Sequence, residues 1–442
     1  MIPDRSAPLR IVIVGGGFGG LYAARVLSGK AVEVTLIDRK NHHTFQPLLY
    51  QVALAVLSPG EIASPLRHVL RKADNIRSLL GEVVGFDVGG RRVTLAGGAQ
   101  VPYDYLIVAA GARHAYFGHD AWEAEAPGLK TIEDAVEIRA RLLLAFEKAE
   151  RAALLTGRRE PPTFSIVGGG PTGVELAGAI ADLARMALAK DFKAIDTTKA
   201  RVRIYEGSPR VLGTFSAESS ERARRQLQEL GVDVHTDSMV TAIEPGRLRV
   251  GNEWIATDVI LWATGVAASP LGKELDTATD RAGRVLVEPD LSVPGHREIF
   301  VVGDMSALTG ADGKPVPGLA AAATQEGRAA AENILRDLRG EARRPFTYHD
   351  RGSMATIGYR RAVAEFGARK LSGSLAWLLW SVVHVFLLIG FRSRVMVMGQ
   401  WIWAYFTRTG SSPLITEYNP KRIEEDAGSH LTLSRPDRAT PC

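Results

Sequence analysis

The sequence of 442 residues contains a single cysteine, Cys442, which lies at its extreme C-terminus. Enzymes that pass electrons through a dithiol need two neighbouring cysteines, so dithiol chemistry is excluded. Long apolar runs are also scarce. The longest, residues 375–391, has 17 residues and contains His384, which places it at the lower limit for crossing a bilayer. No apolar segment precedes the first strand after Arg10, and we expect no secretory signal.

Two glycine-rich turns of the form G-x-G-x-x-G each follow an apolar strand and precede an expected helix. The first is GGGFGG at residues 15–20, and the second is GGGPTG at residues 168–173. Glycine permits the tight turn and the close approach of a pyrophosphate, and the N-terminus of the following helix attracts that anion. Two such turns predict two bound dinucleotides, and we infer a flavin- and nicotinamide-dependent oxidoreductase.

An acidic residue closes each of the two predicted dinucleotide sites. Asp38 and Glu206 end the second strand of their copies, where a carboxylate accepts hydrogen bonds from ribose hydroxyls. Glu206 would repel a 2′-phosphate and therefore favours NADH over NADPH, while the nearby Arg210 keeps NADPH as an alternative. For either acid, the other interpretation is a solvated carboxylate at the end of a strand.

The internal repeat predicts how the domains are arranged. A buried strand that ends in Gly303-Asp304 has no counterpart in the second copy, so we assign it to the first domain, resumed after an insertion. We predict an α/β fold with two Rossmann-like dinucleotide-binding domains and a C-terminal helical region that associates with a membrane. The predicted limits are residues 1–125 and 286–340 for the FAD domain, 126–285 for a linker helix (132–155) and the NADH domain, 341–410 for the membrane-associating region, and 411–442 for a polar tail.

Positive charge is concentrated near the C-terminus. Residues 339–408 contain eleven Arg or Lys and three acidic residues, a net charge of +8, whereas the whole chain has +5. The same stretch holds four of the seven tryptophans and two apolar runs, residues 375–391 and 395–406. Basic flanks and tryptophans beside short apolar helices favour helices that lie in a membrane interface. A core position or a dimer interface is the alternative, and we expect no nucleic-acid partner.

Several long strings of residues resemble a known family. Residues 41–53 (NHHTFQPLLYQVA) resemble the flavin-side loop of the type II NADH:quinone oxidoreductases, single-subunit flavoenzymes. Residues 168–178 (GGGPTGVELAG), 352–358 (GSMATIG) and 390–394 (GFRSR) are similar to the same family. The resemblance implies a glutathione-reductase-like arrangement of the two nucleotide domains. It also implies FAD, NADH oxidation and reduction of a membrane quinone without proton pumping, by a monotopic enzyme on the cytoplasmic face of the cell membrane.

The predicted site residues fall into three groups. Those assigned to FAD are Gly15, Gly17, Phe18, Gly19, Gly20, Asp38, Arg39, Pro47, Val83, Ala110, Gly111, Asp304 and Ala321. Those assigned to NADH are Gly168, Gly170, Pro171, Thr172, Gly173, Glu206, Thr264 and Gly265. The resemblance assigns catalytic roles to Glu175, in quinone protonation, and to Gln325. We expect no metal site, since no His, Cys or acidic residue lies at ligand spacing around His384.

The sequence departs from the family where flavin is expected to meet quinone. Many members carry Ala-Gln-x-x-Gln there; Gln325 matches the second glutamine, but Ala322 stands where the first would be. We expect the quinone near Gln325 and residues 45–47. Asp304 as a loop cap, Glu175 as a complement to the helix dipole and Gln325 on a polar helix face are the structural alternatives. At the level of function, the alternatives are a soluble NAD(P)H oxidase or ferredoxin reductase, or a weakly active redox sensor, and a homodimer stays open beside a monomer.

Overall fold

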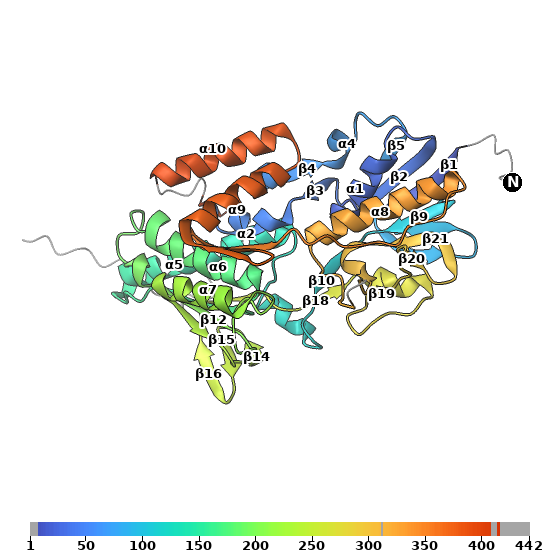
Figure 1. Ribbon diagram of the computed structural model, residues 1–442. Helices are drawn as coiled ribbons and strands as arrows, with labels where there is room; N and C mark the ends of the chain where they lie inside the picture. Colours follow the sequence, from blue (N-terminus) through green and yellow to red (C-terminus); the bar gives the residue numbers. More distant parts are fainter. Residues whose placement is uncertain (1–7, 311–312, 408–412, 416–442) are drawn as a thin grey trace, which may run out of the picture. The chain divides into compact units, whose positions relative to one another are not determined.

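The computed structural model describes residues 8–310, 313–407 and 413–415 (Figure 1). Its contacts divide the chain into two units. The first unit comprises residues up to Thr44, Ala63–Ala115 and Val266–Arg351. The second comprises Phe45–Ile62, Tyr116–Gly265 and the chain from Gly352 on. From the sequence, residues 45–62 were expected in the FAD domain and residues 341–410 in a region of their own.

The first unit is built on a six-stranded sheet with the order β20-β21-β9-β1-β2-β5. Strand β1 is parallel to both of its neighbours and is buried along Ile11–Val14, as expected for a central strand rich in β-branched residues. The sheet strands are β1 (Leu9–Val14), β2 (Val32–Asp38), β5 (Ile76–Leu80), β9 (Tyr105–Val108), β20 (Ser292–Val293) and β21 (His296–Val301). Strand β21 therefore brings a late segment of the chain into the first sheet.

Smaller elements complete the first unit. Its helices are α1 (Phe18–Leu27), α4 (Leu66–Val69) and α8 (Ala320–Leu338), with the 3₁₀ turns η5 (Pro270–Leu275) and η6 (Gly303–Met305). Its remaining strands are β3 (His42–Thr44), β4 (Ala63–Pro65), β6 (Val83–Asp87), β7 (Arg92–Leu95), β8 (Gln100–Pro102), β10 (Ala112–His114), β18 (Val266–Ala268), β19 (Val285–Leu286) and β22 (Ser306–Ala307). Helices α1 and α8 pack side by side (Figure 1). A Cβ on Gly327 would lie 2.1 Å from the Gly19 carbonyl oxygen, so only glycine permits this crossing.

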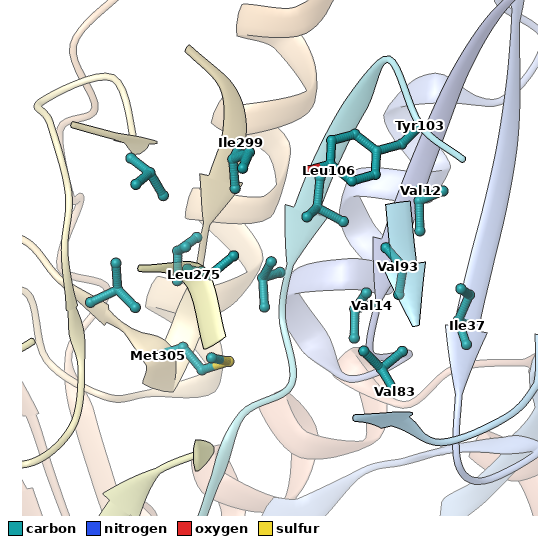
Figure 2. Close-up of a cluster of buried hydrophobic side chains, with 14 of the residues drawn as sticks. Val12, Val14, Ile37, Val83, Val93, Tyr103, Leu106, Leu275, Ile299 and Met305 are labelled. Atoms are coloured by element: carbon teal, nitrogen blue, oxygen red, sulfur yellow. The ribbon is translucent and has the colours of Figure 1, made fainter. Parts of the chain in front are cut away.

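The core of the first unit joins residues that are far apart in the sequence. Figure 2 shows Val12, Val14 and Ile37 of the sheet in one cluster with side chains from the segment 275–305. The labelled members from that segment are Leu275, Ile299 and Met305, and all three are fully buried. The loop that ends at Met305 is thus fixed to the same core as the first glycine-rich turn.

The second unit repeats the nucleotide-binding pattern on a four-stranded sheet with the order β13-β12-β11-β17. The central strand β11 is parallel to β12 and β17, as β1 is to β2 and β9. The strands are β11 (Thr163–Val167), β12 (Arg201–Tyr205), β13 (Val232–His235) and β17 (Val259–Trp262). In both units the glycine-rich turn therefore lies at the point where the strand order reverses, which is where dinucleotides bind.

The remaining elements of the second unit surround this sheet. The helices are α2 (Leu49–Ala53), α3 (Pro59–Ile62), α5 (Ile132–Thr156), α6 (Pro171–Asp182), α7 (Ala217–Glu229), α9 (Gly373–Leu387) and α10 (Phe391–Thr407), with the short turns η1 (Gln46–Leu48), η2 (Asp120–Ala124), η3 (Leu183–Ala187) and η4 (Thr197–Lys199). The antiparallel strands are β14 (Val240–Glu244), β15 (Arg247–Val250), β16 (Glu253–Ala256), β23 (Ser353–Gly358), β24 (Arg361–Phe366) and β25 (Arg369–Ser372). Helix α5 begins with a capping box at Thr131 and ends at Gly157 in the left-handed conformation.

The sheet β23-β24-β25 packs on α6, α7 and α9, and the sequence analysis did not foresee it. The two apolar runs form helices α9 and α10, of 15 and 17 residues. None of the helices within the described ranges combines the length and hydropathy that a membrane span needs. Apolar side chains remain exposed on both helices: Leu375, Leu378, Val382, Phe386, Leu387, Phe391, Val395, Met396, Met398, Ile402 and Trp403.

Candidate active site

The first glycine-rich turn has a shape that only glycine allows. Gly15 has φ +102°, and a Cβ on Gly20 would lie 1.9 Å from the Gly15 carbonyl oxygen. Gly17 precedes α1 in extended conformation, no side chain caps the helix, and an added Cβ there would meet only open space. Asp38 accepts a hydrogen bond from the Gly16 N–H at 2.6 Å. The uncapped helix end and the space before it suit a pyrophosphate, and Asp38 stands beside it at the end of β2.

The other residues assigned to FAD lie around this turn, with one exception. Phe18 and Gly19 open α1, Arg39 follows β2, Ala110 and Gly111 follow β9, and Ala321 lies in the first turn of α8. Asp304 lies in η6. The Val83 side chain is buried in the core cluster of Figure 2, so any contact that it makes with FAD comes from its main chain. Pro47, in η1, belongs to the second unit.

Two buried groups that the predictions left out support this site, one at the first turn and one at the loop that carries Asp304. The His43 Nδ1–H donates to the Gly16 carbonyl oxygen at 3.0 Å, and burial lowers the pKa of His43 to about 4. Glu326 on α8 accepts hydrogen bonds from the Gly303 N–H at 2.5 Å and the Ser306 hydroxyl at 2.9 Å. Burial raises the pKa of Glu326 to about 7. A carboxylate on α8 thus holds the loop that carries Asp304.

The second glycine-rich turn repeats the first. Gly168 has φ +108°, and a Cβ on Gly173 would lie 1.9 Å from the Gly168 carbonyl oxygen. Gly170 precedes α6 without a side-chain cap and faces open space. Glu206 accepts a hydrogen bond from the Gly169 N–H at 2.6 Å. The same cradle for a pyrophosphate is therefore present twice.

The remaining residues assigned to NADH are grouped at the same end of the second sheet. Pro171 and Thr172 open α6, and Thr264 and Gly265 follow β17. Glu206 also accepts a hydrogen bond from the Ser208 N–H at 2.7 Å, which fixes its carboxylate beside the turn. The Arg210 guanidinium donates to the Gly213 carbonyl oxygen at 3.1 Å.

A cavity of about 170 Å³ lies within the second unit beside α6. Its wall is largely aromatic and aliphatic, with Glu175 and Asp182 as its two carboxylates. The aromatic residues of the wall are Tyr50, Tyr359, Trp377, Trp380 and Trp401. An apolar pocket with a few convergent polar groups is the usual form of a small-molecule site.

Both carboxylates of the cavity hold protons more tightly than usual. Burial raises the pKa of Glu175 to about 8, against one weak backbone donor, the Thr356 N–H at 3.5 Å. Burial also raises the pKa of Asp182 to about 6, opposed by the Tyr359 N–H and by Arg361 and Arg185. Paired shifts of this kind at a pocket mark groups suited to proton transfer.

A chain of side-chain hydrogen bonds connects α10 to the cavity. The Trp401 Nε1–H donates to Gln51 Oε1 at 2.7 Å, and the Gln51 amide donates to the Tyr50 hydroxyl at 2.9 Å. The Tyr50 hydroxyl and the Thr356 hydroxyl share a hydrogen bond of 3.0 Å. Burial, with Glu175 nearby, raises the pKa of Tyr50 well above its usual value, so Tyr50 stays protonated.

Gln325 and His384 make local contacts. Both atoms of the Gln325 amide bond the main chain of His349, at 3.0 Å each. The His384 Nδ1–H donates to the Trp380 carbonyl oxygen at 2.8 Å, and its ring stacks on Trp380. Within the residues that the structure describes, no group of three or more His, Cys, Asp or Glu side chains is placed to hold a metal ion.

Comparison with known proteins adds to this geometry. Residues 9–327 match the pyridine nucleotide-disulphide oxidoreductase family, and residues 350–408 match the NDH2 C-terminal domain. The chain is 45% identical over 423 residues to the type II NADH:quinone oxidoreductase Ndh of Mycobacterium tuberculosis, an alignment that covers 92% of this chain and 90% of that protein. The chain belongs to the type II NADH:quinone oxidoreductase family.

Other relatives agree with this assignment. The type II NADH:quinone oxidoreductase of Haemophilus influenzae is 29% identical over 397 residues, covering 82% of this chain and 89% of that protein. The structure of NDH2 from Plasmodium falciparum in complex with NADH superposes with a TM-score of 0.84 at 21% identity, over 92% of this chain and 99% of that one, which shows the shared fold.

Membership of the type II oxidoreductase family settles the class of reaction and the cofactors. The enzyme oxidises NADH and reduces a quinone through FAD, without pumping protons. The two cradles fit these cofactors, because each offers an uncapped helix end, open space before it and a carboxylate beside it. The recognition, the fold class and the cofactors predicted from the sequence are thus confirmed. The individual site residues stay predictions.

The polar groups that surround Glu175 were not among the predicted site residues. Asp182 follows Glu175 by seven residues, a spacing that places both side chains on one face of a helix, and this signal was present in the sequence. Tyr50 and Gln51 lay inside a string that was quoted only for its resemblance. The hydrogen bond between Gln51 and Trp401 joins residues 350 positions apart, so no local sequence pattern predicts it.

Proposed function

We propose that the quinone ring is reduced in the cavity beside α6 and that Glu175 delivers a proton to it. The observation that carries this proposal is the raised pKa of Glu175, about 8, in the wall of an apolar cavity. A carboxyl group that remains protonated at neutral pH is suited to act as a general acid toward a quinone oxygen. Pro47 lies in η1, directly before the helix that carries Tyr50 and Gln51. The predicted role of Gln325 at the quinone stays a prediction.

The protein's own groups bind and orient the reactants. Bound FAD supplies two-electron transfer between the nicotinamide and the quinone. Asp38 and Glu206 receive ribose hydroxyls, and the N-termini of α1 and α6 receive the pyrophosphates. The N-terminus of α8 favours negative charge on the group that it faces. Three indoles, those of Trp377, Trp380 and Trp401, keep the cavity apolar, so that Glu175 retains its proton until the quinone takes it.

Glu206 supports a preference for NADH over NADPH. Its carboxylate is held beside the second turn by the N–H groups of Gly169 and Ser208. A fixed negative charge at this position repels a 2′-phosphate. Arg210 is engaged with the Gly213 carbonyl oxygen, which directs its guanidinium to the main chain.

Helices α9 and α10 are the proposed attachment to the membrane, on its cytoplasmic face. Leu378 and Phe386 on α9 are 56% and 70% exposed, and Trp403 on α10 is 62% exposed. Exposed apolar residues on adjacent short helices suit burial in the interface of a bilayer. Of the basic residues near these helices, Arg360 and Arg392 are exposed and thus available to anionic lipid. Arg361 instead pairs with Glu229 at 3.5 Å, and Arg394 donates to the Leu388 carbonyl oxygen. A homodimer remains an alternative to a monomer.

The membrane attachment is tested with charges on the exposed face of α9. We expect Leu378→Glu combined with Phe386→Glu to abolish flotation with vesicles of mixed neutral and anionic phospholipid, while NADH still bleaches the flavin. Leu154→Glu is the matched control, because Leu154 is an equally exposed leucine (52%) on α5. Flotation of the double variant at the level of the wild type would contradict the attachment.

The quinone cavity is tested by filling it. Ala179 lines the cavity on α6, and Ala179→Phe would occupy much of its volume of about 170 Å³. We expect anaerobic bleaching of the flavin by NADH to persist and reoxidation by a short-chain quinone to slow by at least about 10-fold, together with a similar loss in Glu175→Gln. Ala149→Phe, in a groove on α5, is the control. Normal reoxidation in both cavity variants would exclude the cavity as the quinone site.

A further inference from the structure

Helix α6 carries a second carboxylate that the function described so far does not use. Asp182 follows Glu175 by seven residues, two turns of helix, so the two side chains share a face about 10 Å apart along the axis. Both line the same cavity, with Ala179 between them. Water fits in such a space, since one water occupies about 30 Å³ and the cavity has about 170 Å³.

The strand β23 and the turn that follows it each supply one hydrogen-bond donor, to Glu175 and to Asp182 respectively. The Thr356 N–H reaches Glu175, and the Tyr359 N–H reaches Asp182 at 2.6 Å. This approach depends on two glycines. A Cβ on Gly178 would lie 1.5 Å from the Ile357 carbonyl oxygen, and one on Gly358 would lie 2.8 Å from Asp182 Oδ2. The backbone therefore packs on α6 closely enough to hold both acids.

The chain changes geometry immediately after Asp182. Residues Leu183–Ala187 form a π-helical turn, and Leu183, Met186 and Ala187 of this turn line the cavity. Single π-turns within helices are frequent at functional sites. Asp182 thus lies where the helix widens beside the cavity.

The charged surroundings of the two acids differ. Asp182 faces Arg185 of the π-turn and Arg361 of β24, and Arg361 in turn pairs with Glu229 of α7. Arg185 is exposed to solvent. Among the residues that the structure describes, no cation opposes the effect of burial on Glu175, whose pKa is lowered by the Thr356 N–H; the Tyr50 hydroxyl of α2 is close by. Asp182 is therefore the acid with arginines beside it, one of which, Arg185, is exposed to solvent.

We propose that Asp182 is the entry point of the proton that quinone reduction consumes, and that it passes this proton through water in the cavity to Glu175. In the reaction NADH + H⁺ + Q → NAD⁺ + QH₂, NADH gives up a hydride, which is two electrons and one proton. The second proton of the quinol comes from solution. That further proton crosses from solvent to Asp182, then to Glu175, then to a quinone oxygen, and Glu175 is reprotonated in each cycle. The inference rests on the proposed position of the quinone.

The relative proton affinities agree with this direction. The pKa of Asp182, about 6, lies below that of Glu175, about 8, so a proton on Asp182 moves downhill to an ionised Glu175. At neutral pH, Asp182 exchanges protons with solvent while Glu175 stays loaded. Arg361 and Arg185 lower the pKa of Asp182, so Asp182 releases its proton to Glu175 more readily.

The decisive variant is Asp182→Asn in the full-length, FAD-loaded protein. The amide oxygen still accepts the Tyr359 N–H, but the side chain no longer carries a proton. Anaerobic stopped-flow measurement should show flavin reduction by NADH within about 2-fold of the wild type. Reoxidation by a short-chain quinone should slow by at least about 10-fold, against the roughly 10²–10⁴-fold that a general acid or base contributes when it acts on the substrate directly. The rate of reoxidation should also depend more steeply on pH above 7. Imidazole, a small weak acid, should restore part of the rate, and a pH-indicator dye should show delayed proton uptake.

Two further variants separate a proton carrier from a structural acceptor. Asp196→Asn is the matched control, because Asp196 also accepts a backbone N–H, from Thr198, but is exposed at the N-cap of η4. Asp182→Ala removes the acceptor of the Tyr359 N–H altogether. If Asp182→Asn matches the wild type at every pH and only Asp182→Ala is impaired, Asp182 merely holds the β23–β24 turn and the proposal is overturned.

The same measurements keep this inference distinct from the proposed function. Slow reoxidation in Glu175→Gln and Ala179→Phe with a normal rate in Asp182→Asn would overturn only the role of Asp182. Normal reoxidation in all three variants would overturn the position of the quinone as well.

Discussion

The two nucleotide cradles are nearly the same in shape but differ in what packs on the helix behind each. Both have a glycine near φ +105° and a helix glycine whose Cβ would fall 1.9 Å from a carbonyl oxygen. In the first unit, α1 is crossed by α8 where Gly19 meets Gly327, and α8 holds the Asp304 loop through Glu326. In the second unit, α6 is crossed by β23 where Gly178 meets Ile357, and its acids face a cavity.

The difference shows how one motif serves two purposes. The helix behind the first cradle is covered by another helix of its own unit and belongs to a closed core, which suits a cofactor that stays bound. The helix behind the second cradle borders a cavity and carries titrating groups, which suits a site where reactants exchange. The phosphate cradle therefore determines which class of molecule binds. The element packed on the helix behind it determines whether that site holds a permanent cofactor or borders a site where reactants exchange.

The largest expected effect comes from Gly20→Ala compared with Gly173→Ala. Each methyl group would overlap a carbonyl oxygen at 1.9 Å, a strain of about 1–3 kcal/mol that corresponds to roughly 5-fold to 150-fold in affinity. Gly20→Ala should purify with little FAD. Gly173→Ala should keep its FAD and need far more NADH to bleach it. The ratio of flavin to protein absorbance and an NADH titration measure both, and loss of FAD in Gly173→Ala would break the comparison.

A smaller effect is expected from the two carboxylates beside the cradles. Glu206→Gln should raise the KM for NADH by about 10-fold and lessen the preference over NADPH, because the charge that repels a 2′-phosphate is lost. Asp38→Asn should lower FAD retention and leave the choice between NADH and NADPH unchanged. Steady-state rates with both nucleotides test this pair. An altered nucleotide preference in Asp38→Asn would show that the two sites are not independent.

The smallest effect on nucleotide binding is expected at Glu326, the buried acid of the first unit, because its titration changes the stability of the fold instead. Its pKa in the folded protein, about 7, lies above the usual 4.5, so the folded state binds the proton more tightly than the unfolded chain. Stability should fall as pH rises from about 4.5 through about 7, by on the order of 3 kcal/mol, and stay low above that. Glu326→Gln should remove the part of this dependence that Glu326 contributes, while Glu175 and Asp182, whose pKa values are also raised, keep theirs. Urea unfolding followed by flavin fluorescence at several pH values measures it, with the exposed Glu332→Gln as control. Parallel pH curves for Glu326→Gln and the wild type would refute the assignment.

Much of the fold was predictable because its signals are local. The turns at residues 15–20 and 168–173 have glycines that no other residue can replace, and the apolar strand before each is continuous. The helix predicted over residues 132–155 is observed as Ile132–Thr156, with its cap residues at both ends. At these turns and helix ends, a few neighbouring residues determine the backbone conformation, so it can be predicted from the local sequence.

The rest depends on contacts between distant segments. Residues 353–372 form a sheet where we expected only membrane-associating helices, because short strands packed on α6 leave little periodicity of their own. Glu175 was singled out, but its raised pKa arises from the cavity that α2, α9 and α10 help to enclose. Asp182 acquires its surroundings from Tyr359 and Arg361, about 180 residues away along the chain.

Three of the seven tryptophans line the cavity, and this gives the enzyme an optical reporter of its own. Indole emission is quenched by an electron-poor ring nearby, so a quinone that enters the cavity should dim the fluorescence of Trp377, Trp380 and Trp401. The remaining indoles, at Trp122, Trp254, Trp262 and Trp403, do not line it and supply a steady background. Occupancy of the cavity can thus be followed by light emission in the unlabelled, resting protein, before any electron moves.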